Sequence, residues 1–482
     1  MNYKMIGRFL SQIISIEAAF LLPAIAVSIG YAEWMVVESF AYTLGIMVIL
    51  SGLLFVSTRR AGKLFGAREG LVCVGFSWVV LSALGALPFL FSGSIPNYID
   101  ALFETVSGFT TTGSSILTDV ESLPKGLLYW RSFTHWLGGM GVLVFLLAIG
   151  PDQGKGFTMH LMRAESPGPD VGKLVPRMKK TAKILYLIYI AITAICFVFL
   201  LFGDMNWFEA LCTTFGTAGT GGFGIRNDSM ASFSAYSQNV CTVFMLLFGI
   251  NFSCYYLLLL KQVKTVLWDE ELRLYLGMVV FATLLIAWNI YGIYGNPADT
   301  LRHSAFQVST IITTTGYTTA NYDLWPAFSK SILLLLMMVG ACAGSTGGGF
   351  KCARVLLVFK SLRRSVRQIL NPQKVQIIRT NGKPVSEAVV SNTNSYMAAY
   401  FIIVVLSVLL VSLDGFDAET NLSAVLACFN NIGPGLAQVG PICNFSGYSP
   451  ASKMILTLDM LAGRLEIFPI LVLFSRRTWS RH

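Results

Sequence analysis

The sequence carries little charge and very little histidine. Of its 482 residues, only 12% are Asp, Glu, Lys or Arg, whereas a soluble domain usually has about 25%. The 4 histidines and the in-span acids form no cluster at the ends of the apolar segments. The shortage of charge excludes an ordinary soluble protein, and the lack of such a cluster argues against a membrane-embedded enzyme.

The sequence also lacks the patterns of common cofactor sites. Its 9 cysteines show no paired spacing and no zinc pattern, so we interpret them as small apolar core residues. No Rossmann or Walker motif occurs, because GTGGFG at 219–224 follows no predicted strand. We therefore expect no covalent cofactor, and any control by a nucleotide must come from a partner protein.

Long apolar segments dominate what is present. The chain is 54% hydrophobic with a mean hydropathy of +0.65, and runs of about 20 apolar residues are long enough to span a bilayer. We predict ten such spans, near 9–30, 35–57, 71–92, 127–150, 184–203, 237–260, 275–294, 331–358, 395–413 and 453–474.

The net charge of +10 follows the connections between these spans. Lys and Arg gather on alternate connections, above all 151–183 and 359–394, and this positive-inside bias places both termini in the cytoplasm. The charge is thus explained by membrane topology, and we expect lipid contacts and no nucleic-acid partner.

Four short polar segments recur between the later spans. Three of them open with Phe followed by Glu or Gln, and each contains a glycine at a similar place. Each is too short to cross the bilayer, so we predict a half-helix that returns as extended backbone. Such backbone is tolerated at membrane depth only where protein surrounds it or it lines a water-filled path. The segments are FETVSGFTTTGSS (103–115), FEALCTTFGTAGTGGF (208–223), FQVSTIITTTGYTT (306–319) and AVLACFNNIGPGL (424–436).

These segments predict an all-α polytopic membrane protein. Four membrane–pore–membrane repeats would surround a pseudo-fourfold pore, preceded by two extra N-terminal transmembrane helices. Half-helices would point their partly negative C-terminal ends inward, and a ring of backbone carbonyls can replace the hydration shell of an alkali cation. The expected parts are 1–70 for the two N-terminal helices and 71–180, 181–272, 273–393 and 394–482 for repeats 1 to 4.

The chain resembles the Trk/Ktr/HKT superfamily of potassium transporters, and within it the TrkH-type membrane subunit of the bacterial Trk uptake system. The motifs that carry the resemblance are SGFTTTG, TGGF, TTTGYTT, NNIGPGL, GACAGSTGGGFK and LAGRLEIFP. The resemblance implies a homodimer in the bacterial plasma (inner) membrane, with a cytoplasmic TrkA-like nucleotide-binding regulatory subunit. It also implies potassium uptake, with Rb⁺ as a mimic.

The resemblance further implies a potassium selectivity filter with one wall from each segment. K⁺ ions would contact Thr111, Thr112, Thr217, Ala218, Thr314, Thr315, Asn431 and Ile432. The register of the second wall stays open, since Gly221 or Gly222 could replace Gly219. The filter residues would be Thr110, Thr111, Thr112 and Gly113; Thr217, Ala218 and Gly219; Thr313, Thr314, Thr315 and Gly316; and Asn430, Asn431, Ile432 and Gly433.

A glycine-rich stretch interrupts the predicted span 331–358, and its glycines would break a helix at mid-membrane. The resemblance implies that this stretch is an intramembrane gating loop, and that Arg464 projects into the pore beneath the filter. Close packing through small residues and a structural ion pair are the alternatives. The expected gate residues are Gly344, Ser345, Thr346, Gly347, Gly348, Gly349, Lys351 and Arg464.

Three further side chains stand out. Glu104 and Glu209 recur at one repeat position, so we expect them to cap or brace the half-helices. His135 lies inside a span, and we interpret it as a hydrogen-bonded structural residue. Asp459 is almost the only in-span carboxylate, which leaves transport coupled to Na⁺ or H⁺ open as an alternative to a channel-like path.

Overall fold

The computed structural model describes residues 1–59, 67–139, 141, 178–374 and 376–479. The regular secondary structure of this part of the chain is helical except for one antiparallel hairpin, formed by β1 (Arg379–Thr380) and β2 (Lys383–Pro384). Most of the basic segment predicted at 151–183, and the end of the span predicted at 127–150, lie outside the described residues.

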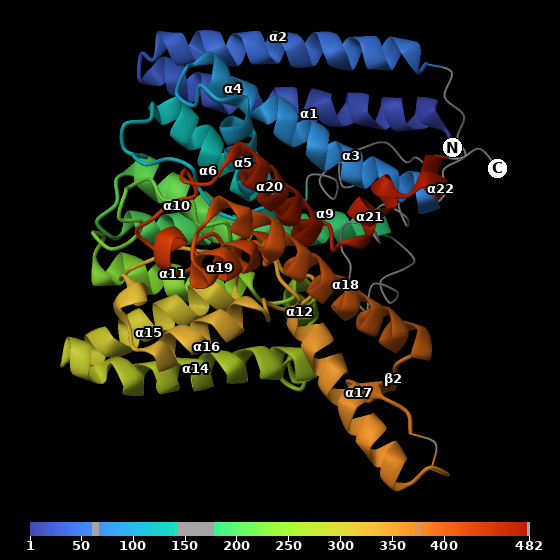
Figure 1. Cartoon of the computed structure of the whole chain (residues 1–482). Helices are drawn as coiled ribbons and strands as arrows, with labels where there is room; N and C mark the ends of the chain where they lie inside the picture. Colours follow the sequence, from blue (N-terminus) through green and yellow to red (C-terminus); the bar gives the residue numbers. More distant parts are fainter. Residues whose placement is uncertain (60–66, 140, 142–177, 375, 480–482) are drawn as a thin grey trace.

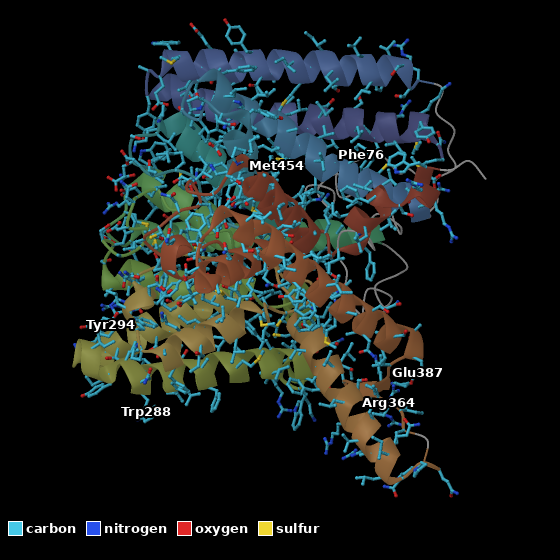
Figure 2. All side chains as sticks on the ribbon, in the orientation of Figure 1. Phe76, Trp288, Tyr294, Arg364, Glu387 and Met454 are labelled. Carbon is cyan, nitrogen blue, oxygen red and sulfur yellow. The ribbon has the colours of Figure 1, made fainter. Side chains whose placement is uncertain are left out.

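Six helical segments of the described chain are long and apolar enough to cross a membrane. Their outward faces are apolar, as Trp288 shows with 75% of its surface exposed (Figure 2). The chain is thus a polytopic all-α membrane protein, as predicted. The segments are α1 (Tyr3–Gly30), α2 (Trp34–Ser57), α3 with α4 (Arg68–Phe91), the apolar part of α9 (Ala182–Leu201), α14 (Glu270–Tyr294), and α18 with a short 3-10 turn (Glu387–Asp414).

Three other predicted spans are broken. The break predicted inside 331–358 is confirmed, because α16 (Ala327–Met337) and α17 (Cys352–Leu370) are separate helices. The continuous helix predicted at 237–260 is wrong, because α11 (Ala235–Phe248) and α12 (Phe252–Leu259) meet at 86°.

The continuous helix predicted at 453–474 is also wrong. It is divided into α20 (Pro450–Arg464) and α21 (Phe468–Phe474). Between these helices Glu466 and Ile467 both have positive φ, 56° and 65°. A left-handed backbone at two successive residues ends an α-helix.

Four shorter helices alternate with the spans. They are α5 (Tyr98–Phe109), α10 (Trp207–Gly219), α15 (Pro297–Ile312) and α19 (Ala418–Phe429). Each begins after an Asn or Asp, and the three asparagines accept backbone N–H groups of the first turn, as N-caps do. Each ends in an extended segment that leads to the next helix, namely α6 (Lys125–Gly139), α11, α16 or α20.

The four short helices lie in the body of the molecule, and their C-terminal halves are buried. α17 and the β-hairpin extend away from this body (Figure 1). An ion pair between Arg364 and Glu387 joins α17 to α18 in this extension (Figure 2). The remaining short elements are α13 (Val263–Leu267), α22 (Arg476–Trp479) and the 3-10 turns at Tyr322–Leu324 and Ala437–Val439.

Candidate ion pathway

The same backbone turn follows each of the four short helices. A residue with positive φ donates its N–H to the carbonyl three residues back, and the next residue donates to the carbonyl five residues back. One residue later comes a glycine, again with positive φ. The left-handed residues are Thr111 (56°), Thr220 (53°), Thr314 (58°) and Asn431 (56°), and the glycines are Gly113 (83°), Gly222 (75°), Gly316 (88°) and Gly433 (104°).

This equivalence corrects the register of the second segment. Thr217 and Ala218 lie inside α10, and Gly219 is its last residue, so they cannot be the counterparts of Thr111, Thr112 and Gly113. The counterparts are Thr220, Gly221 and Gly222, which is the alternative register that the sequence leaves open. The pattern of Phe, three residues and Gly predicts the wrong glycine here, because α10 continues by about one turn beyond Phe215.

A second pattern in the sequence would have found the right glycine. The N-cap residues Asn97, Asn206 and Asp417 all stand 16 positions before the corresponding glycines, which are Gly113, Gly222 and Gly433. Only α15 departs from this spacing, since it is 16 residues long where α5 and α19 have 12. Helix length measured from the cap is thus a better guide here than the Phe-to-Gly spacing.

The four turns form a closed ring. At each glycine, a Cβ atom would lie closer than van der Waals contact to a backbone carbonyl oxygen of the next turn. In each case that carbonyl belongs to the residue just before the glycine of the next turn. The fourth turn contacts the first, which closes the ring. The contacts run from Gly113 to Gly221, from Gly222 to Thr315, from Gly316 to Ile432, and from Gly433 to Thr112.

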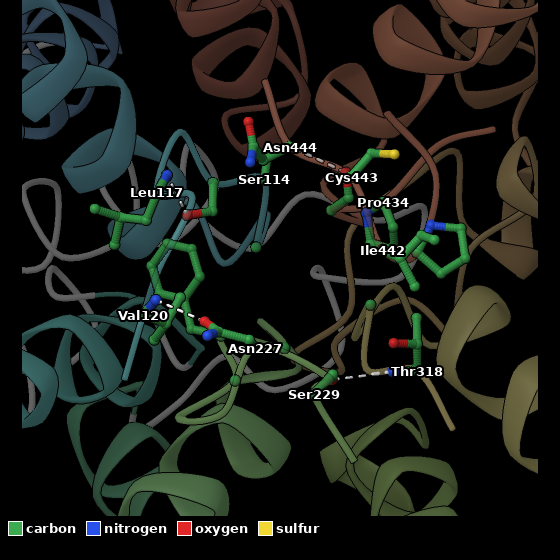
Figure 3. Close-up of a pocket in the computed structure, with 18 of the residues that line it drawn as sticks. Ser114, Leu117, Val120, Asn227, Ser229, Thr318, Pro434, Ile442, Cys443 and Asn444 are labelled. Carbon is green, nitrogen blue, oxygen red and sulfur yellow. Dashed lines mark hydrogen bonds between the residues drawn. The ribbon is translucent and has the colours of Figure 1, made fainter. Parts of the chain in front are cut away.

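All four glycines also line one cavity of about 130 Å³. Its wall is formed by the segments that leave the four turns, including Ser114, Asn227 and Pro434 (Figure 3). One cavity shared by all four turns therefore lies at one end of the ring.

Asn227 ties two of these outer segments together. Its side chain accepts the N–H of Val120 at 2.7 Å and donates to Asp119 Oδ1 at 2.9 Å (Figure 3). The hydrogen bond from Asn227 lowers the pKa of Asp119 below its ordinary value, because it stabilises the charged carboxylate. Asp119 therefore keeps its negative charge near the cavity, where it attracts cations.

The glycine-rich loop between α16 and α17 closes the other end of the ring. The backbone N–H of Gly348 donates to Thr314 Oγ1 at 2.6 Å. A Cβ at Gly348 would lie 2.6 Å from the carbonyl oxygen of Asn430, and one at Gly347 would lie 3.0 Å from that of Thr313. These are the first residues of two turns, so the loop lies directly beneath the innermost carbonyls.

Arg464, at the C-terminal end of α20, holds this loop against the ring. One guanidinium nitrogen donates to Thr346 O at 2.9 Å and to Thr111 Oγ1 at 3.3 Å. The other donates to the carbonyls of Gly138 and Gly139, the latter at 2.9 Å. Arg464 thus joins the loop, the first turn and the end of α6.

The other residues that were expected to form a gate lie in three places. Lys351 is buried and donates to the carbonyl of Gly347, and so it belongs to the part beneath the ring. Gly349 packs against Gly340 inside the loop itself, with the two Cα regions in contact. Gly344 and Ser345 lie further away, where Gly344 O accepts from the N–H of Phe252 at 3.0 Å.

The two carboxylates nearest to Arg464 in sequence, Glu466 and Asp459, bind other residues. Glu466 forms a buried ion pair with Arg354 on α17, and the Arg354 guanidinium lies 4.0 Å from the centre of the Tyr396 ring. Asp459 accepts from Ser407 Oγ at 2.8 Å across the α18–α20 interface. The Glu466–Arg354 pair links the break in α20 to the start of α17, a connection that the sequence did not predict.

The recurring glutamates brace the short helices, as expected. Glu209 completes a capping box with Asn206 and pairs with Arg226 at 2.8 Å. Glu104 is fully buried and pairs with Arg131 Nε at 2.6 Å. Glu104 also accepts from Ser115 Oγ at 2.9 Å, which fixes the segment that leaves the first turn.

Breaking the Glu104–Arg131 pair should destabilise the fold. Glu104→Gln removes one charge of a pair whose side chains are 0% and 3% exposed, so we expect the free energy of unfolding to fall by about 3–5 kcal/mol. Thermal unfolding of the purified protein in detergent measures this change.

The matched control is Glu419→Gln. Glu419 pairs with Lys330 at 3.1 Å, but its side chain is 45% exposed, so the expected loss stays below about 1 kcal/mol. Equal shifts in melting temperature for the two variants would contradict the role given to the buried pair.

Comparisons with known proteins agree over nearly the whole chain. The model of a family described as TrkH, cation transport protein, matches residues 37–481. The chain is 38% identical over 451 residues to the Trk system potassium uptake protein TrkH of Salmonella typhimurium, with 92% of each chain covered. It is 33% identical to the protein of that name from Halomonas elongata, over 100% of both chains.

A solved structure gives the same result for the fold. The crystal structure of the potassium transporter TrkH from Vibrio parahaemolyticus matches with a TM-score of 0.89 at 30% identity, over 100% of both chains. The chain therefore belongs to the TrkH family of cation transport proteins, a family of transporters and not of enzymes.

Proposed function

We propose that this chain is the ion-conducting membrane subunit of a bacterial potassium uptake system, and that K⁺ crosses the ring of four turns. The observation that carries the proposal is the closed cycle of glycine-to-carbonyl contacts. Backbone carbonyls held around one axis can replace the hydration shell of K⁺. The relatives' names state potassium uptake, which supports K⁺ as the transported ion.

The filter would consist of four layers of carbonyl oxygens, one residue from each turn per layer. The C-terminal ends of α5, α10, α15 and α19 lead into these layers, and their partial negative charge favours a cation there. In the corrected register the outermost layer belongs to the four glycines, and the innermost layer belongs to Thr110, Gly219, Thr313 and Asn430.

Gating would depend on the glycine-rich loop beneath this filter. Gly347, Gly348 and Lys351 lie between the inner carbonyls and the cytoplasmic side of the proposed pathway. The guanidinium of Arg464 adds a fixed positive charge, which raises the barrier for a cation. Movement of the loop together with Arg464 would open the path.

The proposal includes the expected partners and topology. The chain would be a homodimer in the bacterial inner membrane, divided into the four repeats and two leading helices, with both termini in the cytoplasm. The extension formed by α17 and the β-hairpin would lie on that side, where a nucleotide-binding regulatory subunit can dock. The name Trk system, which the relatives carry, fits an assembly of several components.

Transport coupled to H⁺ or Na⁺ is the second candidate function. Asp459 favours it, because within the described part of the chain one of its buried carboxylate oxygens, Oδ2, has no hydrogen-bond partner. A buried carboxylate of this kind can carry a proton.

Reversal potentials of the purified protein in liposomes separate the two functions. We expect the potential to follow the K⁺ gradient alone, because the filter needs no second ion. A potential that also shifts with a pH or Na⁺ gradient would establish coupling and contradict the channel-like path. The absence of any K⁺ or Rb⁺ flux would contradict both.

The filter glycines should control selectivity. Gly113→Ser and Gly222→Ser each place a side chain where a carbonyl of the neighbouring turn lies, so each should lower the K⁺/Na⁺ permeability ratio by roughly tenfold or more. Gly93→Ser is the control, since Gly93 also has a positive φ (72°) but has open space around its Cα. An unchanged ratio for Gly222→Ser would contradict the corrected register.

Removal of the Arg464 charge should increase K⁺ flux. Arg464→Ala takes away the fixed positive charge and the hydrogen bonds to the glycine-rich loop, so uptake of Rb⁺ into liposomes should rise several-fold over that of the parent protein. Lys383→Ala, which removes an exposed charge in the β-hairpin, should leave the flux unchanged. Equal or lower flux in a correctly folded Arg464→Ala variant would exclude a gating role.

A further inference from the structure

The second turn of the ring lacks the side chains that the other three provide. In the first turn the hydroxyl groups of Thr110 and Thr112 hydrogen-bond to each other at 2.7 Å, and in the third those of Thr313 and Thr315 do so at 2.8 Å. The fourth turn has Asn430 and Ile432 at these positions, and the second turn has Gly219 and Gly221. The second turn therefore has no side chain at either of these two positions.

The imidazole of His135 lies in the space that a side chain at Gly221 would take. A Cβ built on Gly221 would overlap three atoms of the ring, Cγ, Nδ1 and Cδ2. His135 comes from α6, its surface is 0% exposed, and its ring centre lies 4.1 Å from that of Phe223. The imidazole of His135 thus packs against the outside of the second turn, at a place where the other turns carry their own side chains.

Two hydrogen bonds fix the orientation of this ring. His135 Nδ1 lies 2.8 Å from the carbonyl oxygen of Gly108, and Nε2 lies 3.2 Å from the backbone nitrogen of Phe223. A carbonyl can only accept and a peptide N–H can only donate, so Nδ1 carries the proton and Nε2 accepts. The imidazole therefore bridges the first short helix to the backbone directly after Gly222.

Arg131, one helical turn earlier on α6, supports the same segment. Its guanidinium lies 3.5 Å from the centre of the Phe223 ring and donates to Gly224 O at 2.9 Å. Residues four apart lie on one face of a helix, so Arg131 and His135 together hold the backbone that leaves the second turn.

We propose that His135 is a positioning residue for ion selectivity, which supplies from α6 the side chain that the second turn lacks. The role follows from geometry: the imidazole packs directly against Gly221, and the carbonyl of Gly221 faces Gly113 in the ring of four turns. This inference rests on the proposed function of the four turns as a potassium filter.

A double-mutant cycle between His135 and Gly221 tests the inference. His135→Ala removes the imidazole and should lower the K⁺/Na⁺ permeability ratio about tenfold, because the buried N–H of Phe223 loses its partner and the carbonyl of Gly108 loses one of its hydrogen bonds. Gly221→Thr alone should also lower the ratio, since its side chain meets the ring. The combination of both changes should restore the ratio to within about threefold of the parent, because Thr is the residue at this place in the first and third turns.

Trp136→Phe is the control on the same helix. Trp136 donates to Thr193 Oγ1 at 3.3 Å, stacks on Tyr189 and meets the second segment at Phe215, within α10 and before the turn. Phenylalanine keeps an aromatic ring at this place, so the change should not alter the ratio. All ratios are measured as reversal potentials in liposomes, on protein that elutes as one species in size-exclusion chromatography.

The outcomes of the cycle are distinct. If His135→Ala does not fold, the double variant must still be more selective than Gly221→Thr alone. A double variant no better than either single variant, or an unchanged ratio in folded His135→Ala, would overturn the role of His135. A parent protein that fails to prefer K⁺ would instead overturn the proposed function itself.

Discussion

The structure depends on one constraint, which is that backbone polar groups at membrane depth must have partners or water. The helices satisfy their own N–H and C=O groups, but each of the four turns leaves successive carbonyls without an N–H partner in its own segment. These carbonyls are tolerable only because the turns face one another and share one cavity. The four short helices, the ring and the cavity are therefore consequences of a single requirement, and no one turn could exist at this depth without the other three.

The glycines serve this requirement in two ways. Their positive φ values aim the preceding carbonyls in one direction, and their missing Cβ leaves room for a carbonyl of the next turn. The same two properties recur in the loop between α16 and α17, where Gly347 and Gly348 allow backbone to approach backbone beneath the ring. Glycines thus lie where these non-helical segments contact one another. Larger polar side chains on the surrounding helices, such as those of Arg464 and His135, hold the contacting segments in place through hydrogen bonds.

Much of this arrangement could be predicted from the sequence, because it depends on local patterns. Apolar length identified the membrane helices, and the repeated half-helix and glycine identified the four turns. The glycine-rich stretch identified the break inside the span predicted at 331–358. The register of the second turn could not be predicted from the Phe-to-Gly spacing, since a helix can extend by one turn without any change in its apolar face. The Glu466–Arg354 and His135–Phe223 contacts join residues 112 and 88 positions apart, and no spacing rule in a single sequence indicates such a pairing.

The central claim is that four equivalent turns coordinate K⁺ at one axis. Anomalous X-ray diffraction from crystals grown in Rb⁺ tests it most directly, because it locates the ions without assuming a register. The account predicts Rb⁺ peaks on the axis, at similar distances from the carbonyl oxygens of Thr112, Gly221, Thr315 and Ile432. A ring without Rb⁺, or peaks beside Thr217 and Ala218 within α10, would contradict it.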